Sequence, residues 1–117
     1  MDEVVYISGP MAGLPEMNYP AFNRAARHLR NMGYQVENPA DNPEPECKSW
    51  EGYMRLAIIQ LMRCHILVRL PGWENSRGAS VENDLAQRLG FKIFDLHVFL
   101  GLQIHKNLPV VGEASNA

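Results

Sequence analysis

The sequence has few of the features that mark secreted scaffolds or metal-binding proteins. Its two cysteines, Cys47 and Cys64, are too few for a disulfide framework, and their spacing matches no zinc motif. We therefore expect free thiols in a reducing compartment. No two of the four histidines have the spacing of metal ligands, so the sequence predicts no metal site and no other cofactor.

Long apolar runs and an excess of one charge are also missing. No segment approaches the roughly 20 apolar residues that span a bilayer, and residues 1–7 lack the basic start and apolar stretch of a signal peptide. We expect a cytoplasmic protein with no membrane partner. The formal net charge of −2, from 11 basic and 13 acidic side chains, argues against a protein that coats nucleic acid polymers. A small-molecule nucleotide needs only a local binding site, so this net charge does not exclude it as a ligand.

Strand and helix signals alternate along the chain. Apolar or β-branched runs predict strands at 4–7, 34–37, 66–70 and 92–95. Between them, helical spacing predicts three helices. Asn18 and Ser49 are the expected caps of the first two, and Gly33 and Gly90 the expected stops of the first and third.

This alternation predicts a single α/β domain at 1–108 and a flexible tail at 109–117. Right-handed crossovers give a three-layer α/β/α sandwich, with a mainly parallel sheet of four or five strands of the flavodoxin or Rossmann type. Residues 96–104 fit either a helix or a further strand. The third helix is expected to bury an apolar face made of Val81, Leu85, Ala86 and Leu89.

Ligands of such sheets bind beyond the carboxyl ends of the strands, where two segments carry chemistry. In 76–82, a Ser-x-Gly turn opens a helix whose free N–H groups suit a phosphate. Glu82 follows in the first or second turn, where the helix N-terminus favours an ionised carboxylate. It is either a nucleophile towards a sugar carbon or an acid that only improves the helix dipole.

The second segment is 6–13. Gly9 and Gly13 permit close approach of the backbone to a ligand, and the hydroxyl of Tyr6 is expected near the mouth of the site. The alternative is a core tyrosine followed by a tight turn. Trp50, Tyr53 and Trp73 either stack on a base or belong to the core or an interface.

Four motifs occur in a fixed order: Tyr6-Ile-Ser-Gly-Pro-Met-x-Gly13, Trp50-x-x-Tyr-Met54, Leu70-Pro-Gly-Trp-Glu74 and Ser76-Arg-Gly-Ala-x-x-Glu82. As a set they resemble small bacterial and phage proteins of unknown function in the nucleoside 2-deoxyribosyltransferase-like superfamily, over residues 3–95. Better-understood relatives are the nucleoside 2-deoxyribosyltransferases and the 2′-deoxynucleoside 5′-monophosphate N-glycosidases. These enzymes cleave the bond between base and deoxyribose through a glutamate nucleophile.

The resemblance implies specific roles for residues of this chain. It places the nucleophile at Glu82, with Tyr6 beside it as the second catalytic residue. Ser76 matches the serine that holds the 5′-phosphate, which favours nucleotides over free nucleosides. It also implies a homodimer or higher homo-oligomer. The expected substrate-binding residues are Ser8, Gly9, Met11, Gly13, Asn38, Trp73, Ser76, Gly78 and Ala79.

Two departures from the family pattern bear on activity. The relatives carry an aspartate on the second helix that assists the departing base, and this position falls at Ala57. An acid usual at the start of the third strand is replaced by His65. Asp41 or a partner subunit is a possible substitute. The sequence thus leaves open a deoxyribonucleotide N-glycosidase or transferase, a nucleotide-binding or sensor module with weak or no activity, and a protein-interaction domain without a ligand.

Overall fold

The computed structural model describes residues 3–106 and contains the predicted parallel sheet. The strands lie in the order β2-β1-β3-β4, and every neighbouring pair is parallel. Their bounds are β1 (Val4–Ser8), β2 (Gln35–Glu37), β3 (Ile66–Arg69) and β4 (Lys92–Asp95). The predicted α/β class is confirmed, with a sheet of four strands in the described part of the chain.

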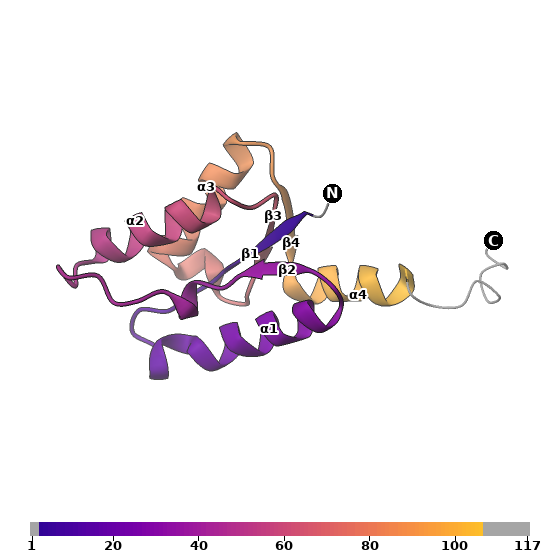
Figure 1. Cartoon of the computed structure of the whole chain (residues 1–117), viewed down its shortest axis with the longest axis horizontal. Helices are drawn as coiled ribbons and strands as arrows, with labels where there is room; N and C mark the ends of the chain where they lie inside the picture. Colours follow the sequence, from indigo (N-terminus) through magenta and orange to yellow (C-terminus); the bar gives the residue numbers. More distant parts are fainter. Residues whose placement is uncertain (1–2, 107–117) are drawn as a thin grey trace, which may run out of the picture.

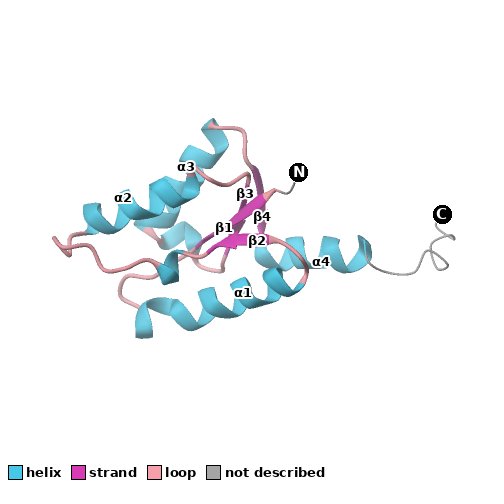
Figure 2. Ribbon diagram, viewed as in Figure 1, coloured by secondary structure: helices cyan, strands magenta, loops and turns pink. Residues whose placement is uncertain are grey.

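Helices cover both faces of this sheet, which gives three layers (Figures 1 and 2). One face packs against α1 and α4, and the other against α2 and α3. Their bounds are α1 (Tyr19–Asn31), α2 (Trp50–Leu61), α3 (Arg77–Arg88) and α4 (Leu96–Lys106). Short 3-10 turns lie at Pro15–Asn18, Pro39–Asp41 and Trp73–Asn75. Among the described residues, no helix is long and apolar enough to cross a bilayer.

The alternation of side chains along β1 positions the site. Val5 and Ile7 belong to the core beneath α1 and α4, whereas Tyr6 belongs to the core beneath α2 and α3. Successive residues of a strand point to opposite faces, so Ser8 lies on the same face as Tyr6. All four side chains are at most 1% exposed. Two hydroxyls of one strand therefore point towards α2 and α3.

The ends of the helices follow the predicted signals, with one correction. Gly33 and Gly90 take the positive φ angles of 97° and 79° that favour glycine. Ser49 caps α2 by accepting a hydrogen bond from the N–H of Gly52. Asn18 occupies the N-cap position of α1, but its side chain makes no capping hydrogen bond. It donates instead to the carbonyl oxygen of Pro10, 2.9 Å away, and thereby holds the loop after β1.

The predicted inner face of α3 is partly wrong. Val81 and Leu89 are 38% and 56% exposed, although the apolar spacing predicted their burial. The buried residues of this helix include two polar ones, Glu82 and Asn83. Apolar periodicity misleads here because hydrogen bonds from other elements satisfy these polar side chains.

Residues 96–104, whose sequence fits either a helix or a strand, lie in the helix α4. This helix packs through Phe99, which is 2% exposed. Its ring lies 5.3 Å from that of Tyr34 and 5.2 Å from that of Phe94, between centroids. The predicted tail, 109–117, lies outside the described residues.

The packing of α4 predicts the effects of two neighbouring substitutions. Phe99→Ala removes a buried ring and should lower the free energy of unfolding by about 3–5 kcal/mol. Val98→Ala changes a side chain that is 44% exposed, and should alter it by less than about 0.5 kcal/mol. Urea unfolding followed by circular dichroism measures both, and equal losses would contradict this placement of α4.

Candidate active site

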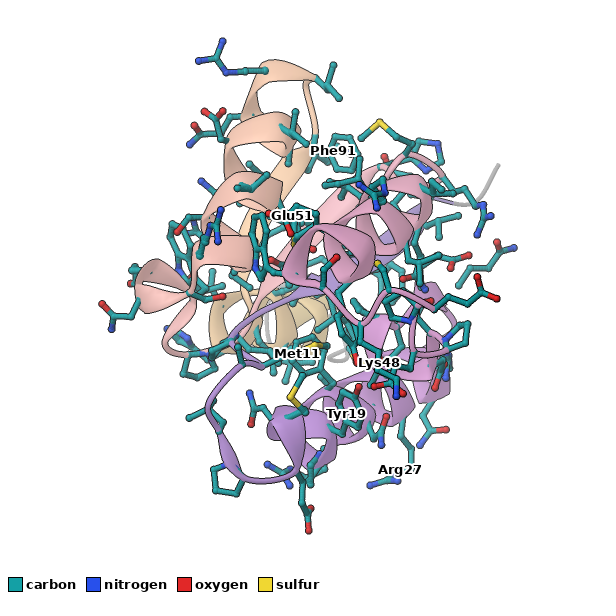
Figure 3. All side chains as sticks on the ribbon, turned by 90° about the vertical axis from the view of Figure 1, so that its left-hand side faces the viewer. Met11, Tyr19, Arg27, Lys48, Glu51 and Phe91 are labelled. Atoms are coloured by element: carbon teal, nitrogen blue, oxygen red, sulfur yellow. The ribbon has the colours of Figure 1, made fainter. Side chains whose placement is uncertain are left out.

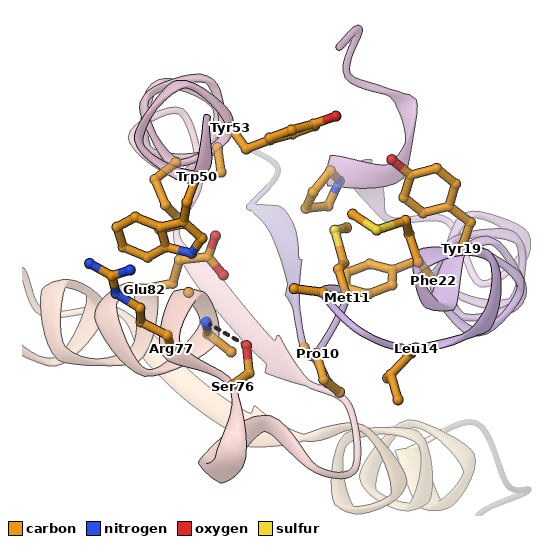
Figure 4. Close-up of a pocket in the computed structure, with 18 of the residues that line it drawn as sticks. Pro10, Met11, Leu14, Tyr19, Phe22, Trp50, Tyr53, Ser76, Arg77 and Glu82 are labelled. Carbon is orange, nitrogen blue, oxygen red and sulfur yellow. Dashed lines mark hydrogen bonds between the residues drawn. The ribbon is translucent and has the colours of Figure 1, made fainter. Parts of the chain in front are cut away.

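A cavity of about 850 Å³ opens at the carboxyl ends of β1 and β3 (Figure 4). Its walls come from the loop after β1, the start of α1, the first turns of α2 and the start of α3. The volume lies within the range of small-molecule sites. The position is the one at which parallel α/β sheets bind ligands, next to the point where the strand order reverses.

Glu82 contributes its carboxylate to this cavity from α3. One oxygen, Oε2, accepts a hydrogen bond from the hydroxyl of Tyr6 at 2.7 Å. The other, Oε1, accepts one from the hydroxyl of Ser8 at 2.6 Å. Glu82 is 6% exposed, so the two hydroxyls of β1 fix the orientation of a nearly buried carboxylate.

Burial sets the ionisation of this group. Loss of solvent raises the pKa of Glu82 from 4.5 to about 7, although the hydrogen bonds from Ser8 and Tyr6 oppose the rise by favouring the charged form. The pKa of Tyr6 is raised well above 10, first by burial and then by the carboxylate of Glu82. Tyr6 therefore remains a donor at neutral pH, and Glu82 changes charge within the physiological range.

The start of α3 forms a second part of the site. Ser76 lines the cavity, and its Oγ accepts a hydrogen bond from the N–H of Ala79 at 3.1 Å. A serine hydroxyl also carries one proton to donate. Gly78 and Ala79 line the cavity as well. A Cβ atom on Gly78 would lie 3.0 Å from the sulfur of Met54, so a larger residue here would have to displace the flexible side chain of Met54.

The loop after β1 supplies Gly9 and Met11 to the cavity. A Cβ atom on Gly9 would lie 2.8 Å from the Cβ of Leu70, so glycine lets the chain approach the residue that follows β3. Met11 shares the wall with Tyr19 and Lys48, and all three side chains are labelled in Figure 3.

Four predicted binding residues do not line the cavity. Ser8 lies behind Glu82 and holds it. Asn38 donates to Asn23 and accepts from the N–H of Ala40, so its side chain holds its own loop. The ring of Trp73 packs against the guanidinium of Arg69, 4.2 Å from the ring centroid. Gly13 has a φ of +83°, a conformation that favours glycine, and so allows the turn after β1.

Other residues line the cavity besides those predicted to bind the substrate. Arg77 lies over the ring of Trp50, with 3.6 Å between its guanidinium carbon and the ring centroid. Met17 and Phe22 add an apolar wall. Trp50 belongs to a predicted motif and is a predicted stacking residue, whereas no binding role was predicted for Met17 or Phe22.

The two departures from the family pattern lie in different places. Ala57 lines the cavity and is 7% exposed, so no carboxyl occupies this part of the wall. His65 lies at the opposite end of β3, where its Nδ1 accepts a hydrogen bond from the N–H of Val4. Asp41 forms an exposed ion pair with Arg30 at 3.7 Å and does not line the cavity.

Comparison with known families gives a match over most of the chain. The family described as a domain of unknown function (DUF4406) matches residues 3–95, and this range includes all four motifs. A comparison with curated proteins finds no match. Membership of the broader deoxyribosyltransferase-like superfamily remains a prediction.

The burial of Glu82 predicts a pH-dependent stability. A carboxyl whose pKa is higher in the folded chain than in the unfolded chain stabilises the fold below about pH 4.5, and this contribution is lost as the pH rises through about 7. Glu82→Gln carries no charge, so it should be more stable than wild type by up to about 3 kcal/mol at pH 8. The difference should disappear at pH 4.

Urea unfolding from pH 4 to pH 8 measures this difference. Glu74→Gln is the control, because Glu74 is exposed and does not line the cavity. A pH-independent difference between Glu82→Gln and wild type would show that Glu82 is not the titrating group.

Proposed function

We propose that this chain, which belongs to the DUF4406 family, cleaves or transfers the N-glycosidic bond of 2′-deoxynucleoside 5′-monophosphates. Glu82 acts as the nucleophile. The observation that supports this function is a carboxylate with both oxygens held by hydroxyls, those of Tyr6 and Ser8, in the wall of a nucleotide-sized cavity. A carboxylate fixed in this way can attack an electrophilic sugar carbon without first losing a full hydration shell.

The reaction proceeds in two displacements at the anomeric carbon. An oxygen of Glu82 bonds to C1′ while the bond from C1′ to the base nitrogen breaks, and the base leaves with the electron pair. Water or a second base then attacks C1′ and releases the carboxylate, as in retaining glycosidases. Tyr6 and Ser8 hold the carboxylate in position throughout. The first step needs an ionised Glu82.

The opposite end of the sugar faces the start of α3. The hydroxyl of Ser76, the guanidinium of Arg77 and the free N–H groups of the first turn are ligands suited to a phosphate. Ser76 and Glu82 are six residues apart on one helix, or about 9 Å along its axis. This separation suits a deoxyribose 5-phosphate with a contact at each end.

Base release measures the proposed activity. Incubation with the common deoxynucleoside monophosphates should release free base, and kcat/KM should rise with pH to a plateau above about 7 as Glu82 ionises. Glu82→Gln should lower the rate at least about 10³-fold, since it removes the nucleophile. Glu74→Gln is the control. Equal rates for wild type and Glu82→Gln with every nucleotide tested, including nucleotides with a modified base, would exclude this mechanism.

A second candidate function is a nucleotide-binding or sensor module without turnover. Ala57 favours it, because an alanine stands where the resemblance places the aspartate that assists the departing base. Titration calorimetry with the same nucleotides, run beside the release assay, separates the two functions. Binding without base release would select the module.

The phosphate position gives a further prediction that holds for both candidates. Ser76→Asp keeps a good N-cap for α3 but sets a negative charge against the phosphate. It should weaken binding of a nucleoside monophosphate at least about 10-fold, by like-charge repulsion, and change binding of the free nucleoside much less. Ser80→Asp, one turn further along α3 and outside the cavity lining, is the matched control. Equal weakening of nucleotide and nucleoside would argue against a phosphate at Ser76.

A further inference from the structure

The cavity wall is poor in groups that can donate a proton. Among its described lining residues, Glu82 is the only one with a carboxyl, imidazole or thiol group. Glu82 cannot both attack the sugar as an anion and protonate the base that leaves. The other ionisable side chains in the wall are Lys48, Arg77, Tyr19 and Tyr53.

Three of these four groups do not suit protonation of a base beside Glu82. Arg77 is packed over Trp50, and a guanidinium does not give up its proton in proteins. Tyr19 lies across the cavity from Glu82, and the hydroxyl of Tyr53 points away from Glu82 (Figure 4). Tyr53 also donates to a carboxylate oxygen of Glu44, 3.3 Å away. Lys48 lies in an exposed loop before α2.

A leaving base needs a proton only if it departs as an anion. When the bond to C1′ breaks, its electron pair moves to the base nitrogen, so a neutral base becomes negative unless an acid protonates it. A base that is already cationic becomes neutral through the same electron movement. The help of an acid, typically worth 10²–10⁴-fold, is then unnecessary.

We infer that the substrates of this site are nucleotides with a positively charged base, such as a ring-N-alkylated purine. This inference rests on the proposed function and specifies its substrate class. Glu82 forms the ester with C1′, the charged ring takes the electron pair and leaves as a neutral base, and no proton moves in this step. Water then cleaves the ester, so that a hydroxyl remains on C1′ and one proton passes to solvent.

The cavity walls fit such a base. Aromatic faces and thioether sulfurs attract a cationic ring, and the wall offers both, from Met11, Met17, Phe22 and Tyr53, whereas one face of Trp50 is covered by Arg77. The side-chain amide of Asn42, one of the two amides in the wall, donates an N–H to Gln60 at 2.8 Å.

The groups around Glu82 allow a simple pH profile. Strand β1 presents the hydroxyls of Tyr6 and Ser8 to it. Helix α2 contributes uncharged residues to the wall, including Ala57, and α3 itself contributes Arg77. With no acid required, the rate on a substrate whose base keeps its positive charge should rise with pH and then stay level, without the falling limb that a catalytic acid produces.

The test compares 7-methyl-2′-deoxyguanosine 5′-monophosphate with dGMP, two substrates that differ by one methyl group and one charge. Rates with Glu82→Gln in the same buffer give the background, because the methylated base is also lost spontaneously. We expect the acceleration over background to be at least about 100-fold larger for the methylated nucleotide. Nicotinamide mononucleotide, which has a cationic pyridinium base on ribose, shows whether the preference extends beyond alkylated purines.

A gain-of-function variant tests the same point from the protein side. Ala57→Asp introduces a carboxyl into the wall and should raise base release from dGMP at least about 10-fold. The difference in acceleration between dGMP and the methylated nucleotide should therefore become smaller. Ala57→Asn has the same size without the acid and should give no such rise. If Ala57→Asp fails to fold, the comparison of the two substrates with the wild-type chain still tests the inference.

The outcomes separate this inference from the proposed function. Release from dGMP accelerated as strongly as release from the methylated nucleotide would overturn the inference and leave the glycosidase in place. If nicotinamide mononucleotide is cleaved, a falling limb at high pH would also overturn the inference, because its pyridinium charge does not titrate. No acceleration with either nucleotide would overturn both.

Discussion

The hydrogen bonds from Tyr6 and Ser8 to Glu82 are the interaction on which the rest of the site depends. They join the central strand β1 to α3, between residues 76 and 74 positions apart in the sequence. Burying an unpaired carboxylate would cost too much free energy for a small domain to bear. Because each oxygen has its own hydroxyl donor, the charge can lie beneath two helices and still face the cavity.

This arrangement has consequences for α3 and for stability. The helix turns Glu82 and Asn83 inward and leaves Val81 and Leu89 exposed, so it gives up apolar burial for a fixed carboxylate. Asn83 is satisfied by Arg69, which also pairs with Asp95 at 2.9 Å. A polar layer therefore runs from the cavity into the end of the sheet, at the place where an ordinary helix would present leucine and valine.

The cavity joins two different chemical environments. Near the start of α3 it offers a hydroxyl, a guanidinium and free N–H groups to an anion, whereas the walls from α1 and α2 are mainly aromatic and sulfur-containing. Glu82 lies in the wall that α3 contributes (Figure 4). A nucleotide has the same division, with a phosphate at one end and a planar ring at the other. If the inference above holds, the shortage of acids in the wall restricts which bases can leave and does not by itself prevent catalysis.

The sequence by itself determined the α/β class, the four strands, the cap of α2, and the candidacy of Glu82 and Tyr6. These features depend on local periodicity, turn residues and motif order, which can be read from neighbouring positions. Only the tertiary structure decided that Ser8 holds Glu82, that Asn38 and Trp73 serve other contacts, that α3 buries its polar face, and that Ala57 leaves a wall of the cavity without an acid. Each of these depends on contacts between residues distant in the chain, and the free energy of such contacts outweighs the local pattern.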